Sequence, residues 1–186
     1  MTTHDDVEAL RRDVQYLLDR TAIQDCIARH ARGCDRHDDD LIASAYFPDA
    51  VDEHGFTTNT GDGYAAWVNA AHAGTSRVHT HNITTQTVEI DGDIAHGDSY
   101  VIVVLLGGDG RTAQFVSGRY LDRLERRDGV WRIALRRSTV EVMFVADASV
   151  LTSGFFQEQG YIRGSRDRND PSYARPLALD TAAERW

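Results

Sequence analysis

The sequence predicts an α+β domain, with helices in the first part of the chain and an antiparallel sheet in the second. Up to about residue 73, apolar residues recur mostly at helical spacing. By contrast, residues 78–144 contain four stretches rich in Val, Ile, Thr, Tyr and Phe. Tight turns rich in Gly and Asp separate these stretches, at residues 91–93, 107–110 and 127–129. Strands joined by such turns pair as antiparallel hairpins.

Three helices are expected. The first covers residues 5–19, with Asp5 or Asp6 as its N-cap, and its pattern resumes after Asp19 and ends near residue 33. A short second helix is expected over residues 39–46, because Pro48 prevents it from continuing far. The third covers residues 63–73, with Asp62 as N-cap. The apolar positions of the first helix are Val7, Leu10, Val14, Leu17 and Leu18.

Five strands are expected, over residues 50–58, 78–90, 94–106, 112–125 and 130–144. In the second strand, His79, His81 and Ile83 share one face, whereas Val88 and Ile90 fall on the other. The last strand changes phase in the same way between residues 135 and 140. Such changes indicate β-bulges or bends, which curl a sheet around a cavity.

The 186-residue chain is expected to form a single domain over residues 1–150. Residues 151–186 then form an extension that packs on this domain or on a neighbouring subunit. Apolar residues on the outer face of the sheet favour a homo-oligomer, either a dimer or a trimer. Cys26 and Cys34 lie about 12 Å apart along one helix, too far for a disulfide, so we expect reduced, buried thiols.

Charge and hydropathy exclude several partners. The net charge is −9 and no basic stripe is present, so a nucleic acid is not an expected partner. No stretch approaches 18 apolar residues, so no membrane partner is expected either. The acidic, helical N-terminus does not have the pattern of a signal peptide, and a cytoplasmic protein is therefore predicted.

Asp35 and His81 are the strongest candidates for catalysis. Asp35 closes the first amphipathic helix, and His81 begins the strand that follows the third helix. A carboxylate beside an imidazole fixes the ring tautomer and supports proton transfer near neutral pH. His79 shares the strand face of His81, so either ring can be the inward base. The sequence contains no nucleotide-binding loop, metal-ligand cluster or nucleophile elbow, which favours acid/base chemistry without a cofactor.

Three segments resemble the SnoaL-like branch of the nuclear transport factor two-like superfamily. They are the helix from Leu18 to Arg36 that ends at Asp35, the segment from Thr80 to Asp93, and the hairpin from Gly118 to Ile133. The resemblance implies a cone-shaped α+β barrel, with the N-terminal helices packed on the concave face of a strongly bent antiparallel sheet. It also implies that Asp35 and His81 form an elimination dyad, as in hexachlorocyclohexane dehydrochlorinase, bile-acid dehydratase and scytalone dehydratase.

Four further residues are candidates for substrate binding: His30, Tyr46, Asp52 and His54. Where a bile-acid dehydratase-like protein carries tyrosines, this chain has His30 and His54, so the leaving-group acid stays open among His30, His54 and Tyr46. The eight histidines, with Asp35 and Asp52, also allow a site of two histidines and one carboxylate. Only Asp52 and His54 have a tight spacing for it, so neither a metal nor another cofactor is predicted.

The expected function is that of a lyase or dehydratase acting on a small hydrophobic molecule, polycyclic or steroid-like compounds included. Val101, Val103 and Phe115 are expected to bury the substrate. Two alternatives remain: a ketosteroid-type isomerase that uses the same base, and a small-molecule-binding or dimerisation module without catalysis. Product mass separates the two reactions, because only dehydration loses water.

Overall fold

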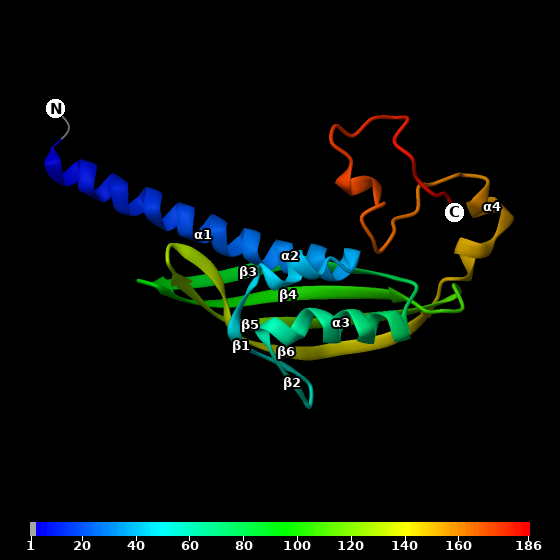
Figure 1. Ribbon diagram of the computed structural model, residues 1–186, viewed down its shortest axis with the longest axis horizontal. Helices are drawn as coiled ribbons and strands as arrows, with labels where there is room; N and C mark the ends of the chain where they lie inside the picture. Colours follow the sequence, from blue (N-terminus) through cyan, green and yellow to red (C-terminus); the bar gives the residue numbers. More distant parts are fainter. Residues whose placement is uncertain (1–2) are drawn as a thin grey trace.

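The computed structural model describes residues 3–186 and has an α+β architecture (Figure 1). Its first part contains α1 (His4–Arg36), α2 (Asp39–Ala43), β1 (Tyr46–His54), β2 (Thr57–Thr60) and α3 (Gly61–Thr75). The meander that follows comprises β3 (Val78–Asp91), β4 (Ile94–Leu106), β5 (Thr112–Arg127) and β6 (Val130–Asp147). After β6 come 3₁₀ turns at Ser149–Thr152 and Pro171–Tyr173, and the short α4 (Gly154–Gln157).

The six strands form one bent sheet in the order β2-β1-β6-β5-β4-β3. The helices α1, α2 and α3 pack on one face of this sheet, which does not close into a barrel (Figure 1). The α+β class and the four-stranded antiparallel meander are thereby confirmed. One pairing differs from the expected antiparallel sheet, since β1 runs parallel to β6. The chain crosses through β2 and α3 to the far edge of the sheet before the meander returns to β1.

The first strand lies four residues earlier than predicted, because the chain reverses inside the predicted range. β1 ends at His54, and β2 begins at Thr57, directly opposite it. Gly55 sits in this turn with a φ of 66°, a conformation that glycine adopts without strain. The predicted single strand over residues 50–58 is therefore a hairpin. α2 likewise ends at Ala43, and Tyr46 opens β1 instead of closing the helix.

Two helix caps differ from the prediction. The N-cap of α1 is Thr3, whose hydroxyl accepts a hydrogen bond from the backbone N–H of Asp6. Asp6 completes a capping box from inside the first turn, so neither Asp5 nor Asp6 is the cap itself. α3 begins at Gly61, after Thr60 as N-cap, which leaves Asp62 in the first turn. Its carboxylate is still at the favourable end of the helix dipole.

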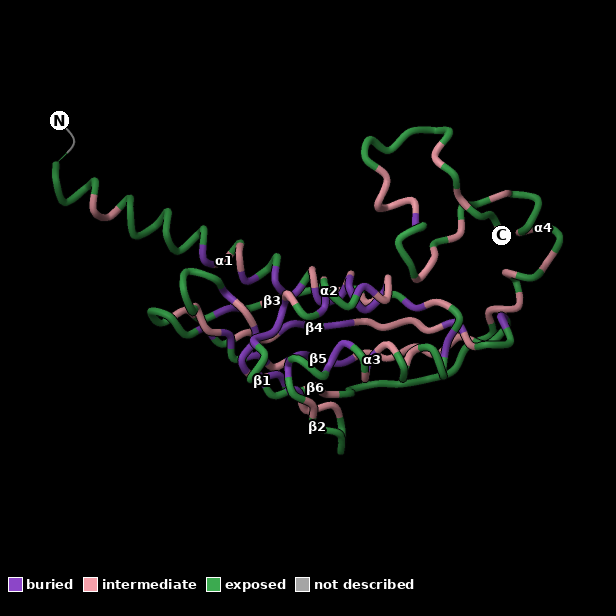
Figure 2. The backbone as a smooth tube through the Cα atoms, in the orientation of Figure 1, coloured by how far each residue is buried: buried purple, intermediate pink, exposed green. Residues whose placement is uncertain are grey.

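α1 is one continuous helix of 33 residues, and only its second half packs on the sheet. Asp19 marks the boundary: its carboxylate accepts hydrogen bonds from the Trp131 indole at 2.8 Å and from Arg126 at 2.8 Å. Beyond it, Ile23 and Ile27 are buried in the core. The first half projects past the sheet (Figures 1 and 2). Its predicted apolar stripe is exposed: Val7, Leu10, Val14, Leu17 and Leu18.

Both strands with a predicted phase change contain breaks in register, but those of β6 fall at Ala134 and Glu141, on either side of the predicted interval 135–140. The β3–β4 pairing shifts between Ile83 and Gln86. The β5–β6 pairing shifts at Gly118 and again at Leu124. Each shift inserts an extra residue on one strand, which bends the sheet toward its helical face. The bend creates the hollow that contains the candidate site.

Cys26 and Cys34 are free and buried, as expected. The final segment reaches back to the end of α1, where Asp170 pairs with Arg36 at 3.3 Å and the Tyr173 hydroxyl donates to Asp38 at 2.7 Å. In the described residues, no helix combines the length and hydropathy needed to cross a membrane.

Tyr100, Val142 and Phe144 are exposed on the sheet, and the expected oligomer stays a prediction.

Candidate functional site

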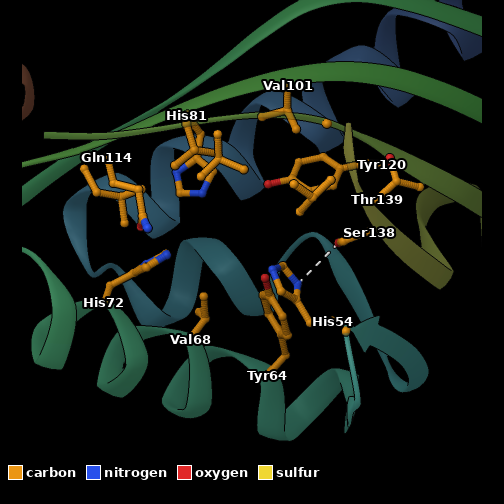
Figure 3. A pocket seen from close by; sticks show the side chains of 16 residues that line it. His54, Tyr64, Val68, His72, His81, Val101, Gln114, Tyr120, Ser138 and Thr139 are labelled. Carbon is orange, nitrogen blue, oxygen red and sulfur yellow. Dashed lines mark hydrogen bonds between the residues drawn. The ribbon is translucent and has the colours of Figure 1, made fainter. Parts of the chain in front are cut away.

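A cavity of about 460 Å³ lies between α3 and the bent sheet (Figure 3). Most of its wall is aliphatic and comes from α3 and the three strands β4, β5 and β6: Val68, Val101, Val103, Leu105, Val116 and Val140. Polar side chains interrupt this wall: His54, Tyr64, His72, His81, Gln114, Tyr120 and Ser138. An apolar hollow with a few polar groups is typical of a small-molecule site.

Asp35 and His81 are in direct contact at one end of this cavity. Nδ1 of His81 lies 2.7 Å from Oδ1 of Asp35, although 46 residues separate them in the chain. The backbone N–H of His81 also donates to both carboxylate oxygens, at 3.0 Å each. Because the carboxylate only accepts hydrogen bonds, the proton of the neutral ring lies on Nδ1. Nε2 is therefore the free acceptor, and the ring lines the cavity.

The end of α1 explains how Asp35 reaches this position. Asp35 lies in the last helical turn, and His37 then ends the helix in the left-handed conformation with a φ of 49°. A carboxylate is disfavoured at this end of the helix dipole. Three hydrogen bonds from His81 compensate for that placement, and Asp35 is only 8% exposed. Burial strengthens the coupling between the carboxylate and the ring.

His79 occupies a different environment from His81 despite sharing its strand face. Its Nε2 donates to the backbone carbonyl of Cys34 at 2.9 Å, and its Nδ1 lies 3.3 Å from the Ser76 hydroxyl. Both ring nitrogens are thus engaged, and His79 is not in the cavity wall. Burial lowers the pKa of His79 to about 4. The geometry therefore favours His81 over His79 as the ring that meets a bound molecule.

His72 also lines the cavity beside His81 (Figure 3). Its ring lies 5.4 Å from the ring of His81 and 4.0 Å from that of His79. Burial, reinforced by His79 and His81, lowers the pKa of His72 to about 2. The ring is therefore neutral near pH 7 and offers one donor and one acceptor. Its Nδ1 is buried without a hydrogen-bond partner.

Two sets of side chains around His79 are close enough to share a metal ion. They are His37, His72 and His79, and Asp35, His79 and His81, with ligand atoms within 4.8 Å of one another in each set. The Arg166 guanidinium approaches the first set, donating to the His72 carbonyl at 3.2 Å and lying 3.5 Å from Nε2 of His37. A fixed positive charge there opposes a second cation. In the second set, Nδ1 of His81 and both nitrogens of His79 already have hydrogen-bond partners.

At the far end of the cavity, His54 pairs loosely with a second carboxylate. His54 lines the wall, and its Nδ1 lies 3.3 Å from the Ser138 hydroxyl. Oδ1 of Asp52 lies 3.6 Å from the same nitrogen, beyond hydrogen-bonding distance. Asp52 is fully buried, and its other oxygen accepts a hydrogen bond from the Tyr46 hydroxyl at 2.9 Å. Asp52 and His54 thus share one face of β1, as their alternation indicated.

The candidates His30, Tyr46 and Asp52 lie behind the cavity wall instead of in it. His30 is fully buried, and its ring packs 5.6 Å from each of Tyr46, Tyr64 and Tyr120. Burial lowers the pKa of His30 well below its usual range, so the ring is neutral. Because Tyr64 and Tyr120 form part of the wall, a bound molecule meets these tyrosines before it meets His30.

A buried ion pair supports this layer from below. Arg136 and Asp122 form two hydrogen bonds of 2.7 Å, and both side chains are fully buried. The Arg136 guanidinium carbon lies 3.9 Å from the centre of the Tyr120 ring, a cation–π contact. Burial raises the pKa of Tyr120, so its hydroxyl keeps its proton. In Figure 3 this hydroxyl points into the cavity.

Sequence reasoning missed several wall residues. Tyr64, Val68 and His72 follow one another at four-residue intervals on α3, a spacing that puts them on one face of a helix. This signal was available in the sequence. Phe115 was expected in the wall, but it stacks on Phe144 at 4.7 Å. Its neighbours Gln114 and Val116 face the cavity instead, because side chains alternate along β5.

With its fold and cavity described, the chain can be compared with known proteins. The model of the SnoaL-like domain matches residues 15–137, and the chain therefore belongs to this family. The structural neighbours lie in the nuclear transport factor two-like superfamily, as the resemblance implied. Among the curated proteins, none matches the chain.

Three solved structures illustrate the likeness. The dehydrochlorinase LinA type 3 of Novosphingobium barchaimii is 24% identical with a TM-score of 0.67, and the match covers 72% of this chain and 94% of that one. Rv3472 of Mycobacterium tuberculosis, a protein of unknown function, is 30% identical with a TM-score of 0.61, covering 69% and 75%. A candidate scytalone dehydratase of Novosphingobium aromaticivorans is 17% identical with a TM-score of 0.63, covering 69% and 88%.

Proposed function

We propose that this protein is a cofactor-independent lyase that eliminates water from a small, largely apolar molecule. His81 is the base that removes a proton from carbon, and Asp35 holds its ring. The observation that carries the proposal is the 2.7 Å contact between Nδ1 of His81 and Asp35, made where the ring enters an aliphatic cavity. This contact leaves Nε2 as a free lone pair directed at the cavity.

The surroundings of His81 suit abstraction of a proton next to a carbonyl group. Aliphatic side chains such as Val101 and Val103 keep water from solvating the base. The Tyr120 hydroxyl retains its proton and points into the cavity (Figure 3), while its ring rests on the Arg136 cation. A hydrogen bond from this hydroxyl stabilises the negative charge that develops on a substrate carbonyl oxygen.

Structural relatives supply a context for this proposal. Dehydrochlorination and dehydration, the reactions in the names of two neighbours, are both eliminations. At 24% and 17% identity these neighbours share the fold with this chain. Support for an elimination in this chain therefore comes from the residues of its cavity.

A panel of β-hydroxy ketones tests the proposal, including the aldol adduct of acetone and benzaldehyde. The enone product absorbs in the ultraviolet, and mass spectrometry detects the loss of one water. We expect turnover by the wild type and a loss of about 10²–10⁴-fold in kcat for His81→Gln, which removes the base. His96→Gln, at an exposed histidine of β4 outside the cavity wall, is the matched control and should retain activity.

Two results would overturn the proposal. One is unchanged turnover by the His81→Gln variant, checked for folding by circular dichroism. The other is no turnover of any member of the panel. A product of unchanged mass from a β,γ-unsaturated ketone, without any dehydration activity, would assign the same base to an isomerase.

A further inference from the structure

The cavity contains a second imidazole backed by a buried carboxylate, at the end away from His81. His81 comes from β3 and His54 from β1, and three strands of the sheet separate these two. Both rings nevertheless line the same cavity, because the sheet bends around it (Figure 3). A molecule that fills this cavity therefore meets His81 and His72 at one end and His54 at the other.

The carboxylate behind His54 has an oxygen without any partner. Asp52 is fully buried, yet its Oδ1 has no hydrogen-bond partner within residues 3–186. The nearest ring nitrogen is Nδ1 of His54, at 3.6 Å. Leaving a buried carboxylate oxygen unpaired is costly. Protonation of His54 removes that cost, because an N–H on Nδ1 can then donate to Asp52 after a shift of a few tenths of an ångström.

We propose that His54, with Asp52 as its positioning residue, is the general acid that protonates the departing hydroxyl group. This inference rests on the proposed function and names the group that the elimination needs opposite its base. With Nδ1 directed at Asp52, the Nε2–H of the imidazolium points into the cavity. Asp52 stabilises the positive charge of His54 before the reaction and does not touch the substrate.

The step balances in protons and electrons. Nε2 of His81 takes the proton from carbon, and the electron pair of that C–H bond becomes the new C=C bond. The C–O bond breaks with its electrons on oxygen, and this oxygen takes the proton of His54 to leave as water. His81 is then protonated and His54 neutral, and exchange with solvent restores both.

The other polar groups fit this role less well. His30 and Tyr46 lie behind the wall and do not reach a bound molecule. Tyr64 and Tyr120 line the cavity, but burial raises the pKa of both phenols, which makes them hydrogen-bond donors instead of acids. Burial lowers the pKa of His72 to about 2, so it carries no proton to give near pH 7.

The groups that face His54 include one carboxylate and no unpaired cation among the described residues. On β1 the facing group is Asp52, and from α3 the facing titratable group is Tyr64, which stays neutral. On β6, Ser138 contacts His54 directly, and the nearby cation Arg136 is neutralised by its two hydrogen bonds to Asp122. A buried anion without a cation of its own therefore lies next to His54.

The two-ended arrangement also defines a substrate class. The acidic C–H bond must face His81, and the leaving oxygen must face His54, on the opposite side of the molecule. Between these ends the wall is aliphatic, formed by residues such as Val101 and Val116. A β-hydroxy carbonyl compound with an apolar body, whose C–H and C–O bonds lie anti to each other, meets these requirements.

The experiment compares two leaving groups on one carbon skeleton. The probes are the aldol adduct of acetone and benzaldehyde and its acetate ester, because acetate departs without being protonated. We expect His54→Gln to lower kcat for the hydroxy ketone by about 10²–10⁴-fold while changing kcat for the acetate less than about threefold. His81→Gln should lower both rates, and His96→Gln should lower neither.

The pH profile separates a positioning role for Asp52 from a structural one. For the hydroxy ketone, the wild-type kcat/KM should fall on the alkaline side of its maximum, where the general acid of the proposed step is no longer protonated. His54→Gln should lose this alkaline limb. Asp52→Asn should move the limb if Asp52 positions the acid, whereas a merely structural role would lower kcat/KM without moving it.

The outcomes distinguish this inference from the proposed function. Equal losses on both probes in His54→Gln, or an alkaline limb that Asp52→Asn does not move, would overturn the role of His54 while leaving His81 as the base. Loss in neither probe for His81→Gln, or no turnover of either probe by the wild type, would overturn the proposed function and this inference with it.

Discussion

The two ends of the cavity hold the same pair of groups in different ways. Asp35 is in contact with His81 through the ring and the backbone, with hydrogen bonds of 2.7 Å and 3.0 Å. Asp52 stays 3.6 Å from His54, and its other carboxylate oxygen accepts a hydrogen bond from the Tyr46 hydroxyl. The side chain of His81 is 6% exposed, whereas that of His54 is 39% exposed. One pair is fixed, and the other has room to adjust.

This difference can be compared with the role proposed for each imidazole, His81 as base and His54 as acid. A base must present the same lone pair in every cycle, and a carboxylate bonded to Nδ1 ensures that the proton stays there. At the other end the carboxylate is just out of contact with Nδ1 of His54, and the Ser138 hydroxyl is the closer partner of that nitrogen. The two rings therefore differ in how firmly they are held, and not in the sign of the charge beside them.

The largest effect is expected from a substitution that disrupts the contact between Asp35 and His81. Asp35→Asn keeps the shape of the side chain but allows its amide to donate to Nδ1 of His81, which moves the ring proton to Nε2 and removes the base. We expect kcat for the hydroxy ketone to fall by about 10³–10⁴-fold. Steady-state kinetics on both probes measures this. Retention of more than a tenth of the wild-type rate would show that the tautomer is not decisive.

A second substitution removes the buried anion that pairs with Arg136 behind the cavity wall. Asp122→Asn leaves the Arg136 guanidinium buried without its anion, and we expect the free energy of unfolding to fall by about 3–5 kcal/mol. The exposed pair of Asp49 and Arg127 has the same 2.7 Å contact, so Asp49→Asn should lower the free energy of unfolding far less than Asp122→Asn. Urea denaturation measures both. Similar losses in the two variants would contradict the importance of burial.

Low pH should reduce the free energy of unfolding through two buried histidines near His81, His72 and His79. In the folded chain, burial holds the pKa of His79 near 4 and that of His72 near 2, below the 6.5 of an unfolded histidine. Below pH 6.5 the unfolded state therefore binds more protons. The contribution of these two histidines to the free energy of unfolding should be fully present above pH 6.5. As the pH falls toward 4, the free energy of unfolding should decrease by about 1.4 kcal/mol per pH unit for each histidine.

Comparison with a variant checks the source of this slope. Replacing His79 by Gln removes one titrating group, so the stability difference between wild type and His79→Gln should narrow as pH falls from 6.5 to 4. His96→Gln serves as the exposed control. Urea denaturation at several pH values gives the slopes. Identical slopes for wild type and His79→Gln would rule out this histidine as a source.

The smallest effect probes how far His54 depends on its hydroxyl partner. Ser138→Ala removes the hydroxyl that lies 3.3 Å from Nδ1, but Asp52 remains next to the same nitrogen. We expect kcat for the hydroxy ketone to fall by only about threefold, about 0.6 kcal/mol in the barrier. A loss as large as that of His54→Gln would make Ser138, and not Asp52, the group that holds the ring.

Local patterns in the sequence predicted much of this fold. The Gly- and Asp-rich turns define the hairpins of the meander, because such turns depend on a few adjacent residues. The phase changes in β3 and β6 correctly indicated bulges. The parallel pairing of β1 with β6 was not predictable in this way, since nothing within either strand specifies a partner so distant in the chain.

The candidate site shows the same limit. Family motifs singled out Asp35 and His81 as candidates, and the contact between them follows from the packing of α1 on β3. The wall residues Tyr120 and Gln114 carry no motif, and only the sheet bend decides which face of β5 turns inward. His30 and Tyr46 were predicted to bind the substrate, but they pack behind Tyr64. Tertiary packing determines this position, and no local pattern in the sequence reveals it.

The β1–β6 pairing also bears on how the site assembles. Ser138 and His54 are 84 residues apart in the chain, whereas neighbouring strands of the meander are joined by short turns. Closing the longer loop loses more chain entropy and slows folding. We therefore expect the meander, with His81, to form first and the β1–β2 hairpin to dock on it late, so that the His54 end is the last part of the cavity to be completed during folding.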